Sequence, residues 1–62
     1  MGLFEKVKKR LPKQFSIFQF MALCQMEEED HREARNILHQ WVGKGLLVRL
    51  SQNMYEKVEH ST

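Results

Sequence analysis

The residues from Asp30 to Tyr55 constrain the fold more than any other part of this chain. Apolar side chains recur there at the spacing of one helix face, at Ala34, Ile37, Leu38, Trp41 and Val42. Gly45 follows, and glycine readily adopts the left-handed backbone conformation that ends a helix. We therefore predict a helix over residues 30–44 whose tryptophan-bearing face lies in the core.

The residues after Gly45 predict a β-hairpin over residues 46–58. We expect the first strand at residues 46–51 and the returning strand at residues 54–58. Gln52 and Asn53 lie between the two strands and are predicted to form a two-residue turn, because asparagine tolerates a positive φ angle. The sequence leaves the register of this turn open by one residue.

Residues 15–20 carry a strong signal for the start of a second helix. Ser16 precedes Gln19 by three residues, the spacing of a capping box, and Phe15 and Phe20 occupy the two positions of a hydrophobic staple. We predict a helix over about residues 17–26, much of whose circumference is apolar: Ile17, Phe18, Phe20, Met21, Leu23 and Cys24. The same residues include four β-formers, so a strand over residues 15–20 is the alternative, and the cap signals favour the helix.

A short helix is expected before these residues, with a buried stripe formed by Leu3 or Phe4, Val7 and Leu11. Pro12 is predicted to end this helix, because the residue before a proline is pushed out of helical geometry. At the start of the helix at 30–44, Asp30 is the expected cap, with Glu33 at the capping-box position.

The 62 residues make one small domain, which we expect to span residues 1–62 with its core at about 3–58 and frayed ends. Three helices and a hairpin predict an α+β domain that is mostly α. The net charge of +2 is too small to establish a nucleic-acid partner. Its distribution is uneven, since residues 1–13 carry five basic residues and one acidic residue, whereas residues 27–30 are all acidic.

The single Cys24 excludes an internal disulfide and suits a reducing setting, so we expect a cytoplasmic protein in which this thiol is buried. No run approaches the roughly 18 apolar residues of a membrane span, and the N-terminus is too charged for a secretory signal. Lys6 stands where an N-terminal acylation motif requires serine or threonine. We therefore expect no membrane partner.

The chain lacks the usual motifs of metal binding and catalysis. Three histidines and one cysteine, His31, His39, His60 and Cys24, do not have the tight spacing of a metal-ligand set. There is no glycine-rich phosphate loop and no nucleophile-elbow motif. A chain of this size also offers little room for a catalytic cleft. We expect no metal site, no cofactor and no enzymatic activity.

The apolar stripe determines which residues lie on the opposite face of the predicted helix at 30–44. At about 100° per residue, the outward positions are Arg32, Asn36, His39 and Gly43, flanked by Arg35 and Gln40. Arginine pairs with guanine, and asparagine and glutamine pair with adenine. A solvated helix face is the alternative interpretation of these residues.

Further residues are placed to contact phosphates. On or near the hairpin they are Arg49, Gln52, Asn53 and Lys57, and near the N-terminus they are Lys8, Lys9, Arg10 and Lys13. Such contacts add affinity and salt dependence without sequence information. The N-terminal lysines also fit a second interpretation, in which they only form a solubilising face.

The order of helix, helix, turn, helix and two-stranded hairpin resembles the winged helix-turn-helix family. Residues 34–49 resemble its recognition helix and the glycine-leucine entry into the wing, and Tyr55 matches the aromatic residue of the last strand. The resemblance covers about residues 3–58 and implies a three-helix winged helix-turn-helix with a C-terminal two-stranded β-hairpin wing. It implies DNA-reading positions at Arg32, Arg35, Asn36, His39, Gln40, Arg49, Gln52 and Asn53.

These features predict a small protein that binds double-stranded DNA, either a transcriptional regulator or a phage-type or mobile-element accessory factor. Helix 30–44 would lie in the major groove and hairpin 46–58 on the backbone, with Lys57, Lys9 and Lys13 as further contacts. Such a protein would be associated with the nucleoid, and useful specificity would require a homodimer or a larger complex.

The alternative is a protein-interaction module that uses the acidic turn at residues 27–30. Four acids at the tip of a reading helix repel phosphates, and winged helices also bind proteins. Acidic groups at a helix start equally suit the positive end of the helix dipole, which gives these residues a structural role.

Overall fold

The computed structural model describes residues 2–58 as three helices and a three-stranded antiparallel sheet. The elements in chain order are α1 (Leu3–Val7), β1 (Gln14–Ser16), α2 (Ile17–Leu23), the 3-10 turn η1 (Glu28–Asp30), α3 (His31–Gly43), β2 (Leu47–Arg49) and β3 (Met54–Lys57). The predicted α+β class is confirmed. Residues 1 and 59–62, with His60 and the predicted frayed ends, lie outside the described residues.

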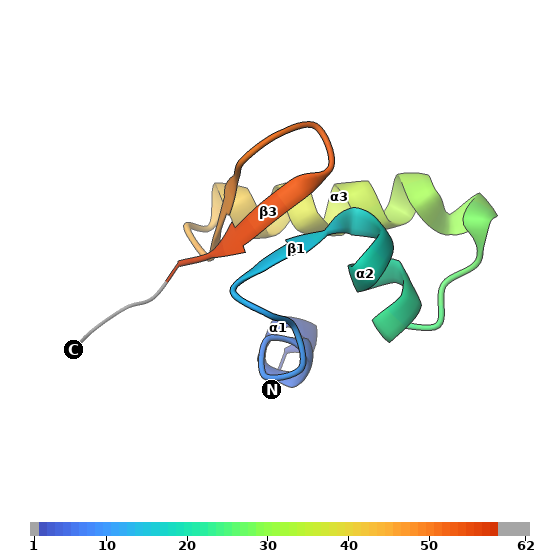
Figure 1. Ribbon diagram of the computed structural model, residues 1–62, viewed down its shortest axis with the longest axis horizontal. Coiled ribbons are helices and arrows are strands. Elements are labelled where there is room, and N and C mark those ends of the chain that lie inside the picture. The colour runs from blue at the N-terminus through green and yellow to red at the C-terminus, as the bar shows by residue number, and fades with distance from the viewer. Residues whose placement is uncertain (1, 59–62) are drawn as a thin grey trace.

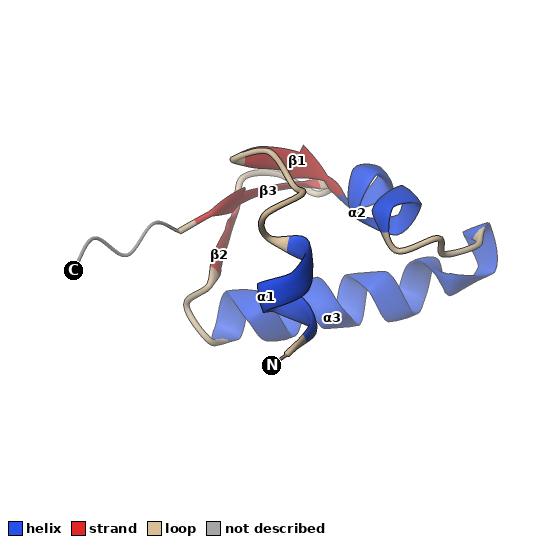
Figure 2. Cartoon of the chain, turned by 90° about the horizontal axis from the view of Figure 1, so that it is seen from below, coloured by secondary structure: helices blue, strands red, loops and turns tan. Residues whose placement is uncertain are grey.

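The long helix α3 runs along one side of the molecule, and α1, α2 and the sheet pack against its other side (Figures 1 and 2). Trp41 of α3 lies at the centre of this packing and is only 7% exposed. Its ring meets Phe4 of α1 at 5.1 Å and Phe20 of α2 at 5.5 Å between centroids, both edge to face. Such aromatic pairs stabilise beyond the area they bury, so one residue joins all three helices.

The predicted apolar stripe of α3 is confirmed. Ala34, Leu38 and Trp41 are buried, and Ile37 and Val42 are half-buried and pack against the core. The predicted stop at Gly45 is also confirmed, because this residue adopts a φ angle of +79°. Gly45 N–H donates to the Val42 carbonyl, and Leu46 N–H donates to the Trp41 carbonyl. These two hydrogen bonds together define a Schellman motif.

The prediction of a two-stranded wing is wrong in its strand number. The sheet has the order β1-β3-β2, with Phe15 of β1 opposite Tyr55 of β3. Both side chains are fully buried, and their rings stack at 6.1 Å. The alternative of a strand at residues 15–20 therefore holds only for its first two residues. The extended backbone before α2 completes the sheet because this position lets Phe15 reach the core.

The two-residue turn at Gln52 and Asn53 is also wrong, because four residues, 50–53, connect β2 and β3. Leu50 N–H donates to the Met54 carbonyl at 2.8 Å and closes the loop. The Asn53 carbonyl accepts a hydrogen bond from Ile17 N–H at the start of α2, also at 2.8 Å. The wider loop thus ties the hairpin to α2, a long-range contact that the local turn propensity does not reveal.

The capping box of α2 is confirmed in both directions. Gln19 N–H donates to Ser16 Oγ at 3.1 Å, and Ser16 N–H donates to Gln19 Oε1 at 2.8 Å. The helix ends at Leu23, three residues before the predicted end. Gln25 has a φ angle of +57°, and Met26 N–H donates to the Met21 carbonyl. This is a second Schellman motif, and its left-handed residue is not the glycine that marks most such ends.

Helix α1 is shorter than its apolar stripe predicts. It ends at Val7, so Pro12 is not its terminator. Arg10 and Leu11 N–H groups both donate to the Val7 carbonyl, and the turn they form brings Leu11 into the core at 4% exposure. The predicted burial of Val7 and Leu11 is therefore correct, although only Val7 lies in a helix.

Two phenylalanines of α2 provide a matched test of this core. Phe20 is fully buried against Trp41, whereas Phe18, which the sequence placed among the apolar residues of the helix, is 57% exposed. Phe20→Ala is expected to lower the free energy of unfolding by about 3–5 kcal/mol. Phe18→Ala should lower it by about 0.5 kcal/mol or less. Urea unfolding followed by circular dichroism measures both, and equal losses would contradict the assigned core.

Candidate nucleic-acid interface

The outward face of α3 carries the predicted reading residues. Arg32, Asn36, His39, Gln40 and Gly43 are all exposed. Within residues 2–58, none of these side chains forms a hydrogen bond or an ion pair. At Gly43 an added Cβ would meet no atom within 4 Å, so the backbone there is open to approach. The face is thus a row of free polar groups on a helix whose other side is held in the core.

Arg35 lies on the flank of this face and is half-buried. Its Nη2 atom lies 3.0 Å from His31 Nε2, one helical turn away. The exposed ring of Phe18 from α2 lies over His31, with 5.7 Å between the ring centroids. Arg35 Nε is buried, and within residues 2–58 it has no hydrogen-bond partner. Arg35 therefore belongs to the junction of α2 and α3, unlike the free groups of the outward row.

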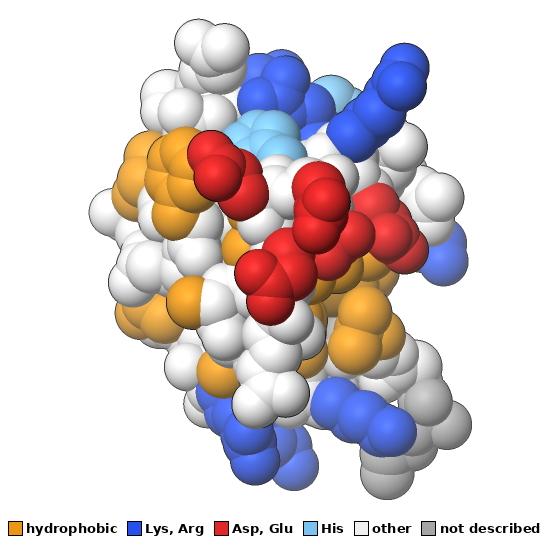
Figure 3. Space-filling view, turned by 90° about the vertical axis from the view of Figure 1, so that its right-hand side faces the viewer, with side chains coloured by type: hydrophobic (Ala, Val, Ile, Leu, Met, Phe, Trp, Pro, Cys, Tyr) orange, Lys and Arg blue, Asp and Glu red, His pale blue; other side chains and the backbone are white. Residues whose placement is uncertain are grey.

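The acidic residues gather at the N-terminal end of α3. Figure 3 shows them in the middle of the end face of the molecule, with basic side chains above and below. Glu27, Glu28 and Glu29 are exposed, and no ion pair to them is present within residues 2–58. The N-terminal end of the candidate interface is therefore negative, whereas its middle, at Asn36 and Gln40, is neutral.

Asp30 is the N-cap residue of α3, as predicted, but its side chain does not cap the helix. Instead, its Oδ2 atom accepts a hydrogen bond from Glu27 N–H at 3.0 Å. The acids form the turn η1, which runs directly into α3, so the Asp30 carboxylate bonds back to the start of that turn.

The hairpin residues have mixed environments. Arg49 and Gln52 are exposed and Asn53 is half-buried. Arg49 Nε donates to the Ser51 carbonyl at 3.1 Å and its Nη2 donates to the Gln52 carbonyl at 3.2 Å. The guanidinium thus holds the loop closed and still faces solvent. In Figure 1 this loop projects at the top of the molecule, beyond the line of α3.

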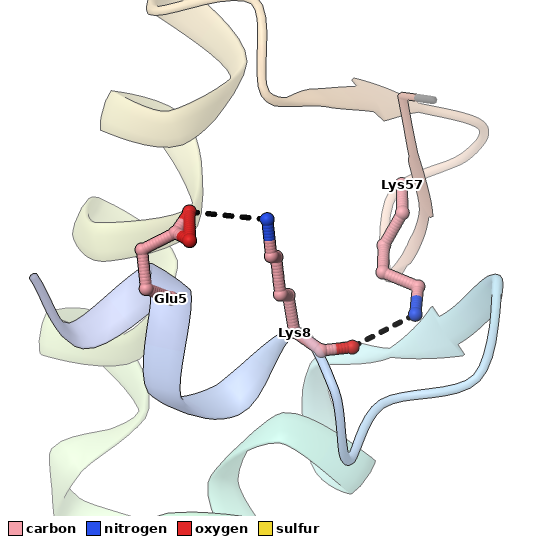
Figure 4. A network of polar contacts seen from close by, with 3 residues as sticks. All are labelled: Glu5, Lys8 and Lys57. Carbon is pink, nitrogen blue, oxygen red and sulfur yellow. Dashed lines mark hydrogen bonds and ion pairs between the residues drawn. The ribbon is translucent and has the colours of Figure 1, made fainter. Parts of the chain in front are cut away.

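Lys57 is not free to contact a phosphate. Its Nζ atom donates to the carbonyl of Lys8 at 2.8 Å (Figure 4). It also donates to the carbonyl of Leu11 at 2.6 Å. These carbonyls belong to the turn that follows α1, so the ammonium joins that turn to β3. We therefore leave Lys57 out of the candidate interface.

The two N-terminal lysines of the prediction lie elsewhere. Lys9 and Lys13 are exposed, but α1 packs on the core side of α3 through Phe4 and Trp41. The Lys13 carbonyl accepts from Lys57 N–H, which places it at the end of the sheet far from the hairpin loop. The structure therefore brings together the α3 residues, but not these lysines, on the outward face.

One surface feature has no counterpart in the sequence-based predictions. An open groove between α1 and the end of α2 is lined by Leu3, Val7, Leu23 and Cys24, and by the charged residues Glu5, Lys6, Lys9 and Arg10. It depends on how α1 lies across α2, which local patterns do not specify. Leu3 was the only sequence feature that could have indicated this groove. The apolar stripe needs either Leu3 or Phe4, so one of these two apolar residues is left over for the surface.

The described residues include no group of three or more histidine, cysteine or acidic side chains placed to hold a metal ion. None of the helices in residues 2–58 is long and apolar enough to cross a membrane. Comparisons with known proteins give no match to this chain among family models, curated proteins or solved structures. Functional inference therefore rests on the chemistry of the surface.

The position of Lys57 leads to a stability prediction. Lys57→Met keeps most of the side-chain length but removes two hydrogen bonds from a charged donor, so the free energy of unfolding should fall by about 1–3 kcal/mol. Lys13→Met, at an exposed position, is the control and should change it by about 0.5 kcal/mol or less. Thermal unfolding measures both, and an unchanged midpoint for Lys57→Met would refute the assigned role.

Proposed function

We propose that this chain is a small DNA-binding winged-helix protein that places α3 in the major groove and the hairpin loop on the adjoining backbone. The observation that carries this proposal is the exposed row of Arg32, Asn36, His39 and Gln40 on one rigid helix. Arginine, asparagine and glutamine match the donor and acceptor patterns of base edges in the major groove. Because α3 is buried on its opposite side, the row is presented in a fixed arrangement.

The acidic end of α3 restricts how the helix meets DNA. Phosphates are repelled at Glu27–29, so the middle of the helix is the better reader. Asn36, His39 and Gln40 lie there, and Gly43 follows with open space above its backbone. We therefore propose that α3 lies lengthwise in the groove, with its N-terminal tip tilted away from the phosphates.

The hairpin supplies the contacts to the backbone in this proposal. Arg49 and Gln52 are exposed at the loop, and the hydrogen bonds of the Arg49 guanidinium keep the loop in shape. Each phosphate that Arg49 neutralises releases counterions, which makes the binding weaker at higher salt. A regulator or accessory factor with so few contacts depends on a second copy or a larger complex for specificity.

The first test removes two side chains from the outward row. Arg32→Ala with Asn36→Ala should weaken binding to a selected duplex at least tenfold, because a bidentate base contact contributes about 1–3 kcal/mol of discrimination. Fluorescence anisotropy with selected and random duplexes at two salt concentrations measures the loss. Lys13→Ala removes the same charge as Arg32→Ala far from the row, and it should not change the preference for the selected duplex. Normal binding by the folded double variant would exclude α3 as the reader.

The second test concerns the acidic turn. Replacing Glu27, Glu28 and Glu29 by glutamine removes three negative charges beside α3, so DNA affinity should rise, most strongly at low salt where screening is weak. Glu56→Gln removes a charge on the sheet, away from the turn, and serves as the control. The same anisotropy titration measures both variants. An unchanged affinity for the triple variant would show that DNA does not approach this end of α3.

A second candidate function is a protein-interaction module that uses the acidic turn 27–30. It is favoured by the exposure of three glutamates without an ion-pair partner in residues 2–58 (Figure 3). In this case, charge reversal of the three glutamates abolishes capture of the protein partner while DNA binding stays at its non-specific level. Under the DNA-binding proposal the reversal strengthens DNA binding instead.

A further inference from the structure

The groove between α1 and α2 is an apolar surface that solvent reaches. Leu3 is 45% exposed, and Leu23 and Cys24 are half-buried. Burial raises the pKa of the Cys24 thiol, which is therefore uncharged at neutral pH and adds to the apolar floor. Exposed apolar side chains that are gathered in one groove are typical of a surface that binds a partner.

The rim of the groove is positively charged. Lys6, Lys9 and Arg10 are exposed along it, and none has an ion-pair partner within residues 2–58. The remaining charged residue of the lining is Glu5, whose carboxylate is paired with Lys8 at 3.1 Å (Figure 4). The groove therefore matches a partner surface that is apolar and negatively charged.

This chain itself carries such a surface next to the groove. Cys24 at the groove floor is three residues before Glu27, so the acidic turn lies within about 10 Å along the chain. Figure 3 shows apolar side chains exposed between the acidic cluster and the basic side chains at the lower edge of the face. The basic rim of the groove, its apolar floor and the acidic turn thus lie next to one another on one surface.

We propose that two copies of this chain associate through this surface as a two-fold symmetric dimer, in which the groove of each copy receives the acidic turn of the other. A two-fold axis brings a patch against itself, so its two ends must be complementary. This patch meets the condition, because one end is basic, with Lys6, Lys9 and Arg10, and the other end is acidic, with Glu27–29. The two-fold axis repeats the contact between a basic and an acidic end, so each dimer contains it twice.

The area of a typical interface indicates that the dimer uses both the groove and the acidic turn. A standard interface covers about 800 Å² on each partner, which is about one sixth of the 4616 Å² of accessible surface of this molecule. A groove beside a five-residue helix is too small to supply this area alone. The groove and the acidic turn together extend over two neighbouring regions of the surface, which brings the patch closer to that size.

The experiment measures mass by sedimentation equilibrium and combines it with charge reversal. Wild-type protein at low salt should reach twice the 7.5 kDa mass of one chain, and high salt should dissociate it. One variant carries Glu27→Lys, Glu28→Lys and Glu29→Lys, and the other carries Lys6→Glu, Lys9→Glu and Arg10→Glu. Each variant alone should be monomeric, because like charges then meet at both contacts. An equal mixture of the two should form a mixed dimer. In it, the reversed turn of one variant meets the reversed groove of the other, and the second contact is the same as in the wild-type protein.

Cys24 provides a second measurement in the same protein. Alkylation of its thiol by iodoacetamide should slow at least tenfold as the concentration of wild-type protein rises and the groove is covered. The rate in each reversed variant alone should not depend on concentration. Lys13→Glu with Lys44→Glu reverses two exposed charges outside the patch and should leave the dimer intact, with circular dichroism reporting the fold of every variant.

Several outcomes would overturn the proposal. A wild-type protein that remains monomeric at all concentrations excludes the dimer, and a mass that grows beyond two copies excludes the two-fold arrangement. Dimeric reversed variants place the interface elsewhere, and a mixture that stays monomeric excludes the groove-to-turn pairing. The dimer proposal does not rest on DNA binding, because mass and thiol reactivity are measured without DNA.

Discussion

The insertion of the Trp41 ring between Phe4 and Phe20 is the contact on which the rest of the structure depends. It fixes the rotation of α3 about its own axis, because the face that carries Trp41 must point inward. The outward row of Arg32, Asn36 and His39 follows from that rotation. It also holds α1 across the molecule, and the position of α1 creates the groove on the opposite side. Both candidate surfaces are therefore consequences of one buried side chain.

The parts of the fold that local chemistry determines were predictable from the sequence. The stripe of α3, its glycine stop and the capping box of α2 each rest on residues within eight positions of one another. The third strand was not predictable in this way, because Phe15 pairs with Tyr55 forty residues away. Lys57 was misassigned for the same reason, since its partners at Lys8 and Leu11 are distant in the sequence. Exposure of Phe18 likewise depends on where α3 packs.

The acidic residues at the N-terminal end of α3 have opposite effects on DNA binding and on the stability of the helix. A helix that reads DNA benefits from positive charge at its N-terminal end, and here η1 places glutamates there. The same acids suit the positive end of the helix dipole and so stabilise α3. Removing the acids would favour DNA binding but would make α3 less stable. A partner that covers the acids resolves this conflict, because it neutralises their field while leaving them at the helix start.

The proposed dimer is such a partner, and it connects the two surfaces. When the basic groove of a second copy covers Glu27–29, the repulsion of phosphates at the α3 tip falls and the row through Asn36 and Gln40 stays free. The basic residues of the groove that pair with the acids are then unavailable for phosphates, which is consistent with their position away from the outward face. Salt would then act on both associations, weakening the pairing between copies and the contacts to phosphates. Binding to DNA would therefore depend on salt more steeply than the number of phosphate contacts alone implies.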